Sequence, residues 1–210
     1  MENKKKSKNT IIKDTIALFL ITMIAGLALG FVYDITKKPI EVAKLNEKQE
    51  AYQAVYQDAK TFEKNDSLSI LAKNAEEVLK EAEIDGVVID EVLEAKDESG
   101  TVIGYVLSVT SSKGYGGDIT ISLGVSSDGT VLGMKTLILN ETAGLGAKAK
   151  EAEFRDQYQG KKVESFKVVK TGKKADDEID AISAATITSS AVTDAVNGGI
   201  YFVNNCAVSN

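Results

Sequence analysis

Residues 101–139 read TVIGYVLSVTSSKGYGGDITISLGVSSDGTVLGMKTLIL, and this stretch is the strongest indicator of the fold. It holds three apolar runs rich in β-branched side chains and separated by glycine-containing turns: residues 101–110, 119–125 and 130–139. A fourth run, residues 87–93, precedes the turn tetrapeptide Asp97-Glu98-Ser99-Gly100. Four consecutive strands with short connections predict an antiparallel sheet, whose apolar face must be covered by helices or by a second sheet.

Segments with helical apolar spacing lie on both sides of these strands and are expected to cover the sheet. Downstream, we expect a helix within residues 148–159, a strand at 166–170 and a C-terminal helix that includes residues 192–203. Upstream, we expect helices over residues 41–62 and 69–82, which could be part of the core or a strut. The sequence therefore predicts one globular α+β domain, with an antiparallel sheet covered by helices.

The N-terminal part of the chain contains an apolar run, TIALFLITMIAGLALGFVY, with no charged side chain over residues 15–33. As a helix rising 1.5 Å per residue, this run would span about 28 Å, close to the hydrocarbon thickness of a bilayer. Lysines are in excess before the run, which favours a cytoplasmic N-terminus and export of everything after Asp34. A cleaved signal peptide is the alternative, but its apolar core would be shorter and would end at a small-residue cleavage site. We expect a retained single-pass anchor in the cell membrane.

The expected organisation has four parts. A basic cytoplasmic tail covers residues 1–13, a transmembrane helix 14–34, a helical stalk or cover 35–85, and the globular domain 86–210. Pro39 is expected to break the helical structure after the anchor and to start the next helix.

Composition excludes several classes of function. The chain has no histidine and a single cysteine, Cys206, so common zinc sites, histidine-ligated haem, iron–sulfur clusters and Ser-His-Asp nucleophiles lack their residues. Beyond residue 34, 20 basic side chains stand against 28 acidic ones, a net charge of −8, which leaves no basic surface for nucleic acid. Any redox function must therefore depend on an organic cofactor.

Residues 180–188, Asp-Ala-Ile-Ser-Ala-Ala-Thr-Ile-Thr, carry the strongest functional signal. They place two hydroxyls, Ser183 and Thr186, just before the C-terminal helix, where a helix N-terminus favours a bound phosphate. Taken alone, such a cluster is more often a helix cap. Two glycine-containing loops, in which backbone can approach a ligand closely, add to this signal: Gly114-Tyr115-Gly116-Gly117 and Asn140-Glu141-Thr142-Ala143-Gly144-Leu145-Gly146.

The motif at residues 180–188 resembles that of the FMN-binding domain family, in which a threonine hydroxyl is esterified to the phosphate of FMN. Matched position by position, the acceptor is Thr186, preceded by Ala185, by Ser183 and, six residues before it, by Asp180. Ala184 stands where the family has glycine, and in the second loop residue 143 is alanine where proline is usual. The three stretches, in this order behind one N-terminal anchor, resemble the G subunit of the Rnf electron-transport complex. The C subunit of the Na⁺-translocating NADH:quinone reductase is its close relative.

The resemblance implies a membrane-anchored electron-carrier subunit of an ion-translocating ferredoxin:NAD⁺ oxidoreductase complex, with FMN bound covalently to Thr186 and no catalysis by this chain alone. It implies other membrane and peripheral subunits as partners, and a separate flavin transferase that uses FAD and magnesium. No catalytic or metal-binding residue is expected in the chain. The expected cofactor-binding residues are Asp180, Ser183, Ala184, Ala185, Thr186, Glu141, Thr142, Gly144, Leu145 and Gly146.

Several alternatives stay open. The chain could be a C-type subunit of the NADH:quinone reductase or a standalone extracytoplasmic flavin carrier. The alanines at 143 and 184 favour an exported binding or scaffold domain without flavin. Thr188 is the nearest alternative acceptor, although we expect it to cap the helix. Asp180 is expected to guide the transferase, against the alternative of a solvated acidic loop.

Overall fold

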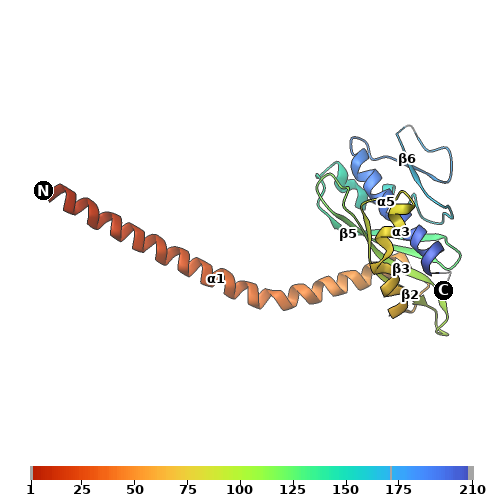
Figure 1. Ribbon diagram of the computed structural model, residues 1–210, viewed down its shortest axis with the longest axis horizontal. Helices are drawn as coiled ribbons and strands as arrows, with labels where there is room; N and C mark the ends of the chain where they lie inside the picture. Colours follow the sequence, from red (N-terminus) through yellow and green to blue (C-terminus); the bar gives the residue numbers. More distant parts are fainter. Residues whose placement is uncertain (1, 171, 208–210) are drawn as a thin grey trace. The chain divides into compact units, whose positions relative to one another are not determined.

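The computed structural model describes residues 2–170 and 172–207, with side chains described from residue 11 onward (Figure 1). The chain divides into two compact units, Met1–Glu47 and Lys48–Asn210. The first unit is helical and belongs to α1 (Glu2–Val55), whose last turns, from Lys48 onward, are part of the second unit. Within the described residues, α1 is the one helix long and apolar enough to cross a membrane, and its apolar side chains along residues 11–33 are exposed.

The predicted break at Pro39 is wrong, because α1 runs through this proline without interruption. The ring of proline is compatible with helical φ, and a proline inside a helix removes one backbone hydrogen bond while the flanking turns remain. The predicted helix over residues 41–62 ends earlier, at Val55. Residues beyond it enter β1 (Thr61–Lys64), which pairs antiparallel with β2 (Val87–Lys96) and draws Phe62 into the edge of the sheet.

Five antiparallel strands form one sheet in the order β1-β2-β3-β4-β5, so each strand pairs with its neighbour in the sequence. The four predicted strands are confirmed as β2 (Val87–Lys96), β3 (Val102–Ser111), β4 (Ile119–Ser126) and β5 (Val131–Leu139). The side chains of β4 alternate between the two faces, with Ile121 and Leu123 on the face that carries the main core. The α+β class and the antiparallel sheet are therefore confirmed.

Three helices pack against that face of the sheet: α2 (Asp66–Lys73), α3 (Ala75–Glu81) and α5 (Thr186–Phe202). The C-terminal helix is buried along most of its length, and its apolar residues join the strand side chains in the main core. A short π-helical turn, η2 (Val203–Ala207), follows it. The predicted helix over residues 69–82 is two helices, because α2 ends at its C-cap residue Asn74.

The opposite face of the sheet is covered by the end of α1 and the residue after it: Tyr52, Val55 and Tyr56 pack with Ala95 and Val106 in a second, smaller core. The Tyr56 hydroxyl donates to the backbone oxygen of Ile103 at 2.6 Å, and burial raises the pKa of Tyr56 to about 12. Close packing here depends on Gly124 of β4, since a Cβ at that position would lie 2.3 Å from the backbone oxygen of Val55.

Between the sheet and α5 the chain forms short elements. The predicted helix over residues 148–159 is instead a 3₁₀ turn, η1 (Gly146–Lys150), followed by the one-turn helix α4 (Ala152–Arg155). The predicted strand at 166–170 is confirmed as β6 (Lys167–Val169). It pairs in parallel with a strand that the sequence did not predict, β7 (Glu178–Asp180). This pair leads the chain to the start of α5.

Candidate cofactor-binding site

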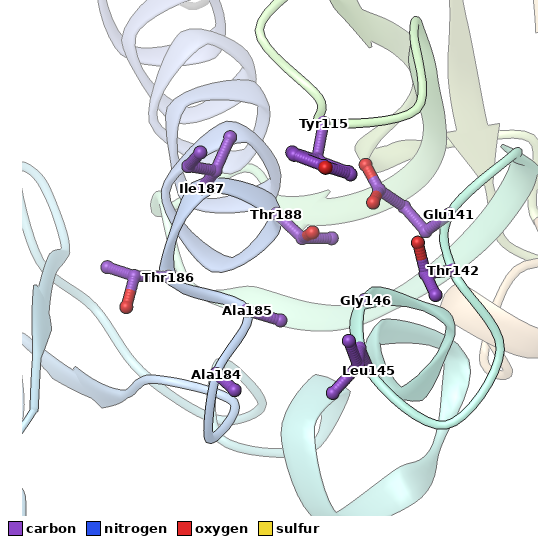
Figure 2. A pocket seen from close by; sticks show the side chains of 10 residues that line it. All are labelled: Tyr115, Glu141, Thr142, Leu145, Gly146, Ala184, Ala185, Thr186, Ile187 and Thr188. Carbon is purple, nitrogen blue, oxygen red and sulfur yellow. The ribbon is translucent and has the colours of Figure 1, made fainter.

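A cavity of about 560 Å³ lies at the N-terminal end of α5, within the size range of small-molecule sites. Three segments that are far apart in the sequence build it: the glycine loop after β3, the loop after β5 and the start of α5 (Figure 2). The lining residues are Tyr115, Glu141, Thr142, Leu145, Gly146, Ala184, Ala185, Thr186, Ile187 and Thr188.

Thr186 is the first residue of α5 and is partly exposed, and the N-cap residue Ala185 has no side chain that could cap the helix. The loop before the helix is held by Ser189, whose hydroxyl accepts from the Ile182 N–H and donates to the Ala185 backbone oxygen, both at 2.9 Å. An uncapped helix start keeps its N–H groups and its partial positive charge available to an anion. The position therefore suits a phosphate.

Ala184 adopts a left-handed backbone conformation, with φ of +61°. This is the conformation that glycine adopts freely and that a side chain opposes by roughly 1–2 kcal/mol. Ala184 therefore keeps the left-handed loop conformation that suits the glycine of the motif. Contacts elsewhere in the fold offset the conformational free energy of this strained alanine.

The loop after β5 brings Glu141 and Gly146 to the other side of the cavity. One carboxylate oxygen of Glu141, Oε1, accepts from the Gly116 N–H at 3.2 Å, which ties this loop to the glycine loop. Gly146 is packed so closely that a Cβ there would lie 2.5 Å from Thr188 Oγ1 and 2.6 Å from Glu141 Oε2. Only glycine leaves room for these two polar groups at the cavity wall.

Thr188 does not cap the helix, so that prediction is wrong. It lies in the first turn of α5, is 1% exposed, and its hydroxyl has no hydrogen-bond partner among the described residues. Figure 2 shows its side chain on the side of Glu141, while the Thr186 side chain lies on the other side of the helix start. The physical reason is register, because two residues of helix turn the side chain about 200° away from that of Thr186. Thr188 thus presents an unpaired hydroxyl to the cavity.

Three of the predicted site residues do not line the cavity: Asp180, Ser183 and Gly144. Asp180 lies at the end of β7, where the side-chain amide of Gln157 pairs with both its backbone N–H and its backbone oxygen, at 2.8 and 3.3 Å. Its carboxylate oxygen Oδ1 is buried and has no hydrogen-bond partner in the described chain. The environment of Asp180 therefore differs from that of a solvated acidic loop. Ser183, by contrast with Asp180, is exposed.

Three lining residues were not among the predicted cofactor-binding residues: Tyr115, Ile187 and Thr188. Tyr115 and Ile187 are large hydrophobic side chains that are 71% and 55% exposed, and both lie on the wall of this cavity. The sequence signal for Tyr115 was its place inside the glycine loop. For Ile187 it was an apolar side chain just inside a helix whose other apolar residues are buried.

The cavity has the properties that FMN requires. Apolar side chains of Tyr115, Leu145 and Ile187 can face a planar ring system, and the open start of α5 can take a phosphate. The unpaired Thr188 hydroxyl and the space left by Gly146 place polar groups where a cofactor could bond to them. Within the described residues no cluster of side chains could hold a metal ion.

Comparison with known proteins agrees with this geometry. A model of the FMN-binding domain matches residues 114–200, a range that contains every residue of the cavity wall. The G subunit of the Na⁺-translocating ferredoxin:NAD⁺ oxidoreductase complex of Acetobacterium woodii is 34% identical to the chain, over 98% of the chain and 99% of that protein. The G subunit of the proton-translocating ferredoxin:NAD⁺ oxidoreductase complex of Clostridium ljungdahlii is 32% identical, over 94% of each. The crystal structure of NqrC from Shewanella oneidensis aligns with 54% of this chain and 58% of that one, with 26% identity and a TM-score of 0.47.

Proposed function

Since the chain belongs to the family of G subunits of ion-translocating ferredoxin:NAD⁺ oxidoreductase complexes, we propose that its FMN is attached through a phosphoester bond to Thr186. The chain is a membrane-anchored flavoprotein subunit with an FMN-binding domain. The observation that carries the proposal is the position of Thr186, partly exposed on the cavity wall at the uncapped start of α5. A phosphate joined to its hydroxyl oxygen would lie where the helix favours negative charge.

Attachment needs a chemical partner that this chain does not contain. The Thr186 oxygen would attack the FMN phosphorus of FAD, the bond to the bridging oxygen would break, and AMP would leave. The hydroxyl proton must pass to a base, and the chain has no histidine to accept it. A flavin transferase with a magnesium ion supplies both the base and the charge neutralisation. Asp180, with its unpaired buried oxygen six residues before the acceptor, is the residue we assign to positioning this loop for the transferase.

A link through the phosphate leaves the ring of the cofactor unmodified, so that FMN supplies both one-electron and two-electron transfer. The side chains of this chain then have a binding role. Tyr115, Leu145 and Ile187 form the apolar part of the wall, and Glu141, Thr142 and Thr188 form its polar part. A covalent bond also keeps the cofactor on a domain outside the cytoplasm, where a dissociated flavin would be lost by dilution.

We also propose how the chain is oriented across the membrane. We assign residues 1–13 to the cytoplasm, 14–34 to the membrane and the region from 35 onward to the outer side, with 35–85 as stalk or cover and 86–210 as the FMN-binding domain. The lysine excess before the apolar run supports this orientation. The partners are the other subunits of the complex, together with the flavin transferase during maturation.

The alternative of an exported domain without flavin depended on the two alanines of the motifs. Ala184 keeps the left-handed conformation, so the loop geometry that favours the phosphate is retained. The family assignment of the whole chain also favours the G subunit over the C-type subunit of the quinone reductase.

The bond to Thr186 is tested by mass spectrometry of peptides from full-length protein co-expressed with its flavin transferase. We expect the mass of FMN on the peptide that contains Thr186. Thr186→Val should abolish the added mass, because it removes the hydroxyl and keeps the branched shape. Thr186→Ser keeps a hydroxyl and should retain at least part of the modification.

Thr188→Val is the control that separates the two hydroxyls of the cavity wall. It should keep the covalent flavin, because Thr188 is buried and faces away from Thr186. Flavin fluorescence on the denatured Thr186→Val protein, or its loss from Thr188→Val alone, would assign the bond to another residue.

A further inference from the structure

We propose that the Glu141 carboxylate lowers the reduction potential of the flavin by holding a negative charge inside the cavity. The inference rests on the proposed function in one respect, that the flavin ring lies in this cavity, and does not depend on the bond to Thr186. Of the described residues that line the cavity, Glu141 is the one that carries a formal charge at neutral pH; the others are apolar or neutral polar. Among the side chains of the cavity wall, this carboxylate is therefore the one charge that a bound ring would meet.

Glu141 is held in place from two sides. Its Oε1 accepts from the Gly116 N–H at 3.2 Å, and its Oε2 occupies the space that a Cβ at Gly146 would fill, 2.6 Å from that position. The side chain is partly buried between these two loops. A carboxylate held between these two loops acts on the cofactor as part of the cavity wall.

The charge of Glu141 is not neutralised by a neighbour. No lysine or arginine in the described part of the chain forms an ion pair with it, and Gly116 provides a neutral donor. The nearby Thr188 hydroxyl makes no hydrogen bond to the carboxylate or to any other described group. The field of the carboxylate therefore reaches into the cavity without a compensating cation.

Reduction adds negative charge to the flavin ring, and a like charge nearby makes that step less favourable. In a partly buried site the effective dielectric constant is well below that of water, so that two charges a few Å apart still interact strongly. The expected consequence is a flavin with a more negative potential, which is a stronger electron donor once reduced. Glu141 therefore sets the reduction potential of the cofactor and takes no part in making or breaking a bond.

The test is a spectroelectrochemical titration of full-length, detergent-purified protein at one pH and one ionic strength. Glu141→Gln removes the charge and keeps an oxygen that can accept from the Gly116 N–H. Glu98→Gln is the matched control, since it makes the same change in net charge at the exposed turn between β2 and β3. This turn lies at the opposite end of β3 from the glycine loop, roughly 30 Å away at 3.3 Å per residue.

We expect the potential of Glu141→Gln to be more positive than that of the wild type, with at least about a tenfold change in the ratio of oxidised to reduced flavin at a fixed potential. Glu98→Gln should match the wild type. Equal potentials for Glu141→Gln and the wild type, with flavin bound in both, overturn this inference and leave the proposed function intact. A potential that moves in the negative direction overturns it as well.

Two further arms keep the test decisive. Glu141→Ala also removes the charge, and should shift the potential in the positive direction if Glu141→Gln does not fold; no shift there overturns the inference. The titrations are run on co-expressed protein and on protein supplied with free FMN. Absence of flavin from the wild-type protein in both preparations overturns the proposed function and this inference together.

Discussion

Among the individual residues, Ala184 in the loop before α5 has a backbone conformation that side chains disfavour. Its φ is +61°, and the turn around it is closed by the Ala185 N–H, which donates to the Ile182 backbone oxygen at 2.9 Å. Ser189 fixes the same turn from within the helix. Because these contacts determine the backbone on both sides, the strain persists at Ala184 instead of relaxing.

We therefore predict that Ala184→Gly stabilises the protein. Relief of the left-handed strain outweighs the greater flexibility of glycine in the unfolded chain, and the expected gain is about 1 kcal/mol in the free energy of unfolding. Chemical denaturation of the detergent-solubilised protein measures it. Ala191→Gly, in the buried interior of α5, is the control and should instead destabilise by about 2 kcal/mol, from lower helix propensity and the loss of a buried methyl group. A loss of stability in Ala184→Gly would show that the alanine is unstrained.

Among the helices and strands, the sheet is packed on both faces, and the kind of packing differs between the two faces. On one face, α5 and the strands share a continuous apolar core. On the other face, the end of α1 approaches the backbone of β4 and β5, where Gly124 and Gly133 have no side chains. Glycine in a strand normally weakens it, so its presence at both positions is explained by the close approach of Val55.

Substitution of these two glycines should have graded effects. A Cβ at Gly124 would lie 2.3 Å from the Val55 backbone oxygen, whereas a Cβ at Gly133 would lie 3.2 Å from the Val55 Cα. We expect Gly124→Ala to destabilise by about 2–3 kcal/mol and Gly133→Ala by about 1 kcal/mol or less, because overpacking against backbone cannot be relieved by a rotamer change. Thermal unfolding followed by circular dichroism gives the comparison. Equal effects would contradict the close packing of Val55 on β4.

The chain in its entirety combines a long apolar helix with a flavin-binding domain, in a family whose members are subunits of membrane complexes. Electron transfer in such a complex depends on which side of the membrane holds the flavin. The lysines before residue 15 favour the cytoplasm for the N-terminus, which would place the domain outside.

Labelling of single cysteines tests this orientation. In a Cys206→Ser background, Glu98→Cys adds a thiol at an exposed turn of the domain, and Ser7→Cys adds one before the apolar run. A membrane-impermeant maleimide applied to intact cells should label Glu98→Cys, and should label Ser7→Cys only after lysis. The reverse pattern would invert the proposed topology, and labelling of both would mean that the chain does not span the membrane.

Features encoded by local pattern were predictable from the residues alone. Alternation of apolar residues predicted β2 to β5, the length and apolarity of residues 15–33 predicted a helix able to span a membrane, and the order of three motifs predicted an FMN-binding domain. These features depend on side chains that are neighbours in the sequence. They can be predicted from the sequence without knowing which residues are in contact in the folded protein.

Other features follow from long-range pairing and packing. The strands β1 and β7 carry too few apolar residues to be recognised, and exist because another strand offers them hydrogen bonds. The composition of the cavity wall also depends on tertiary structure. Tyr115 from one segment meets Ile187 and Thr188 from another, and Asp180 does not line the cavity. The three-dimensional arrangement sets these positions, because their free energy comes from contacts that no local window of sequence contains.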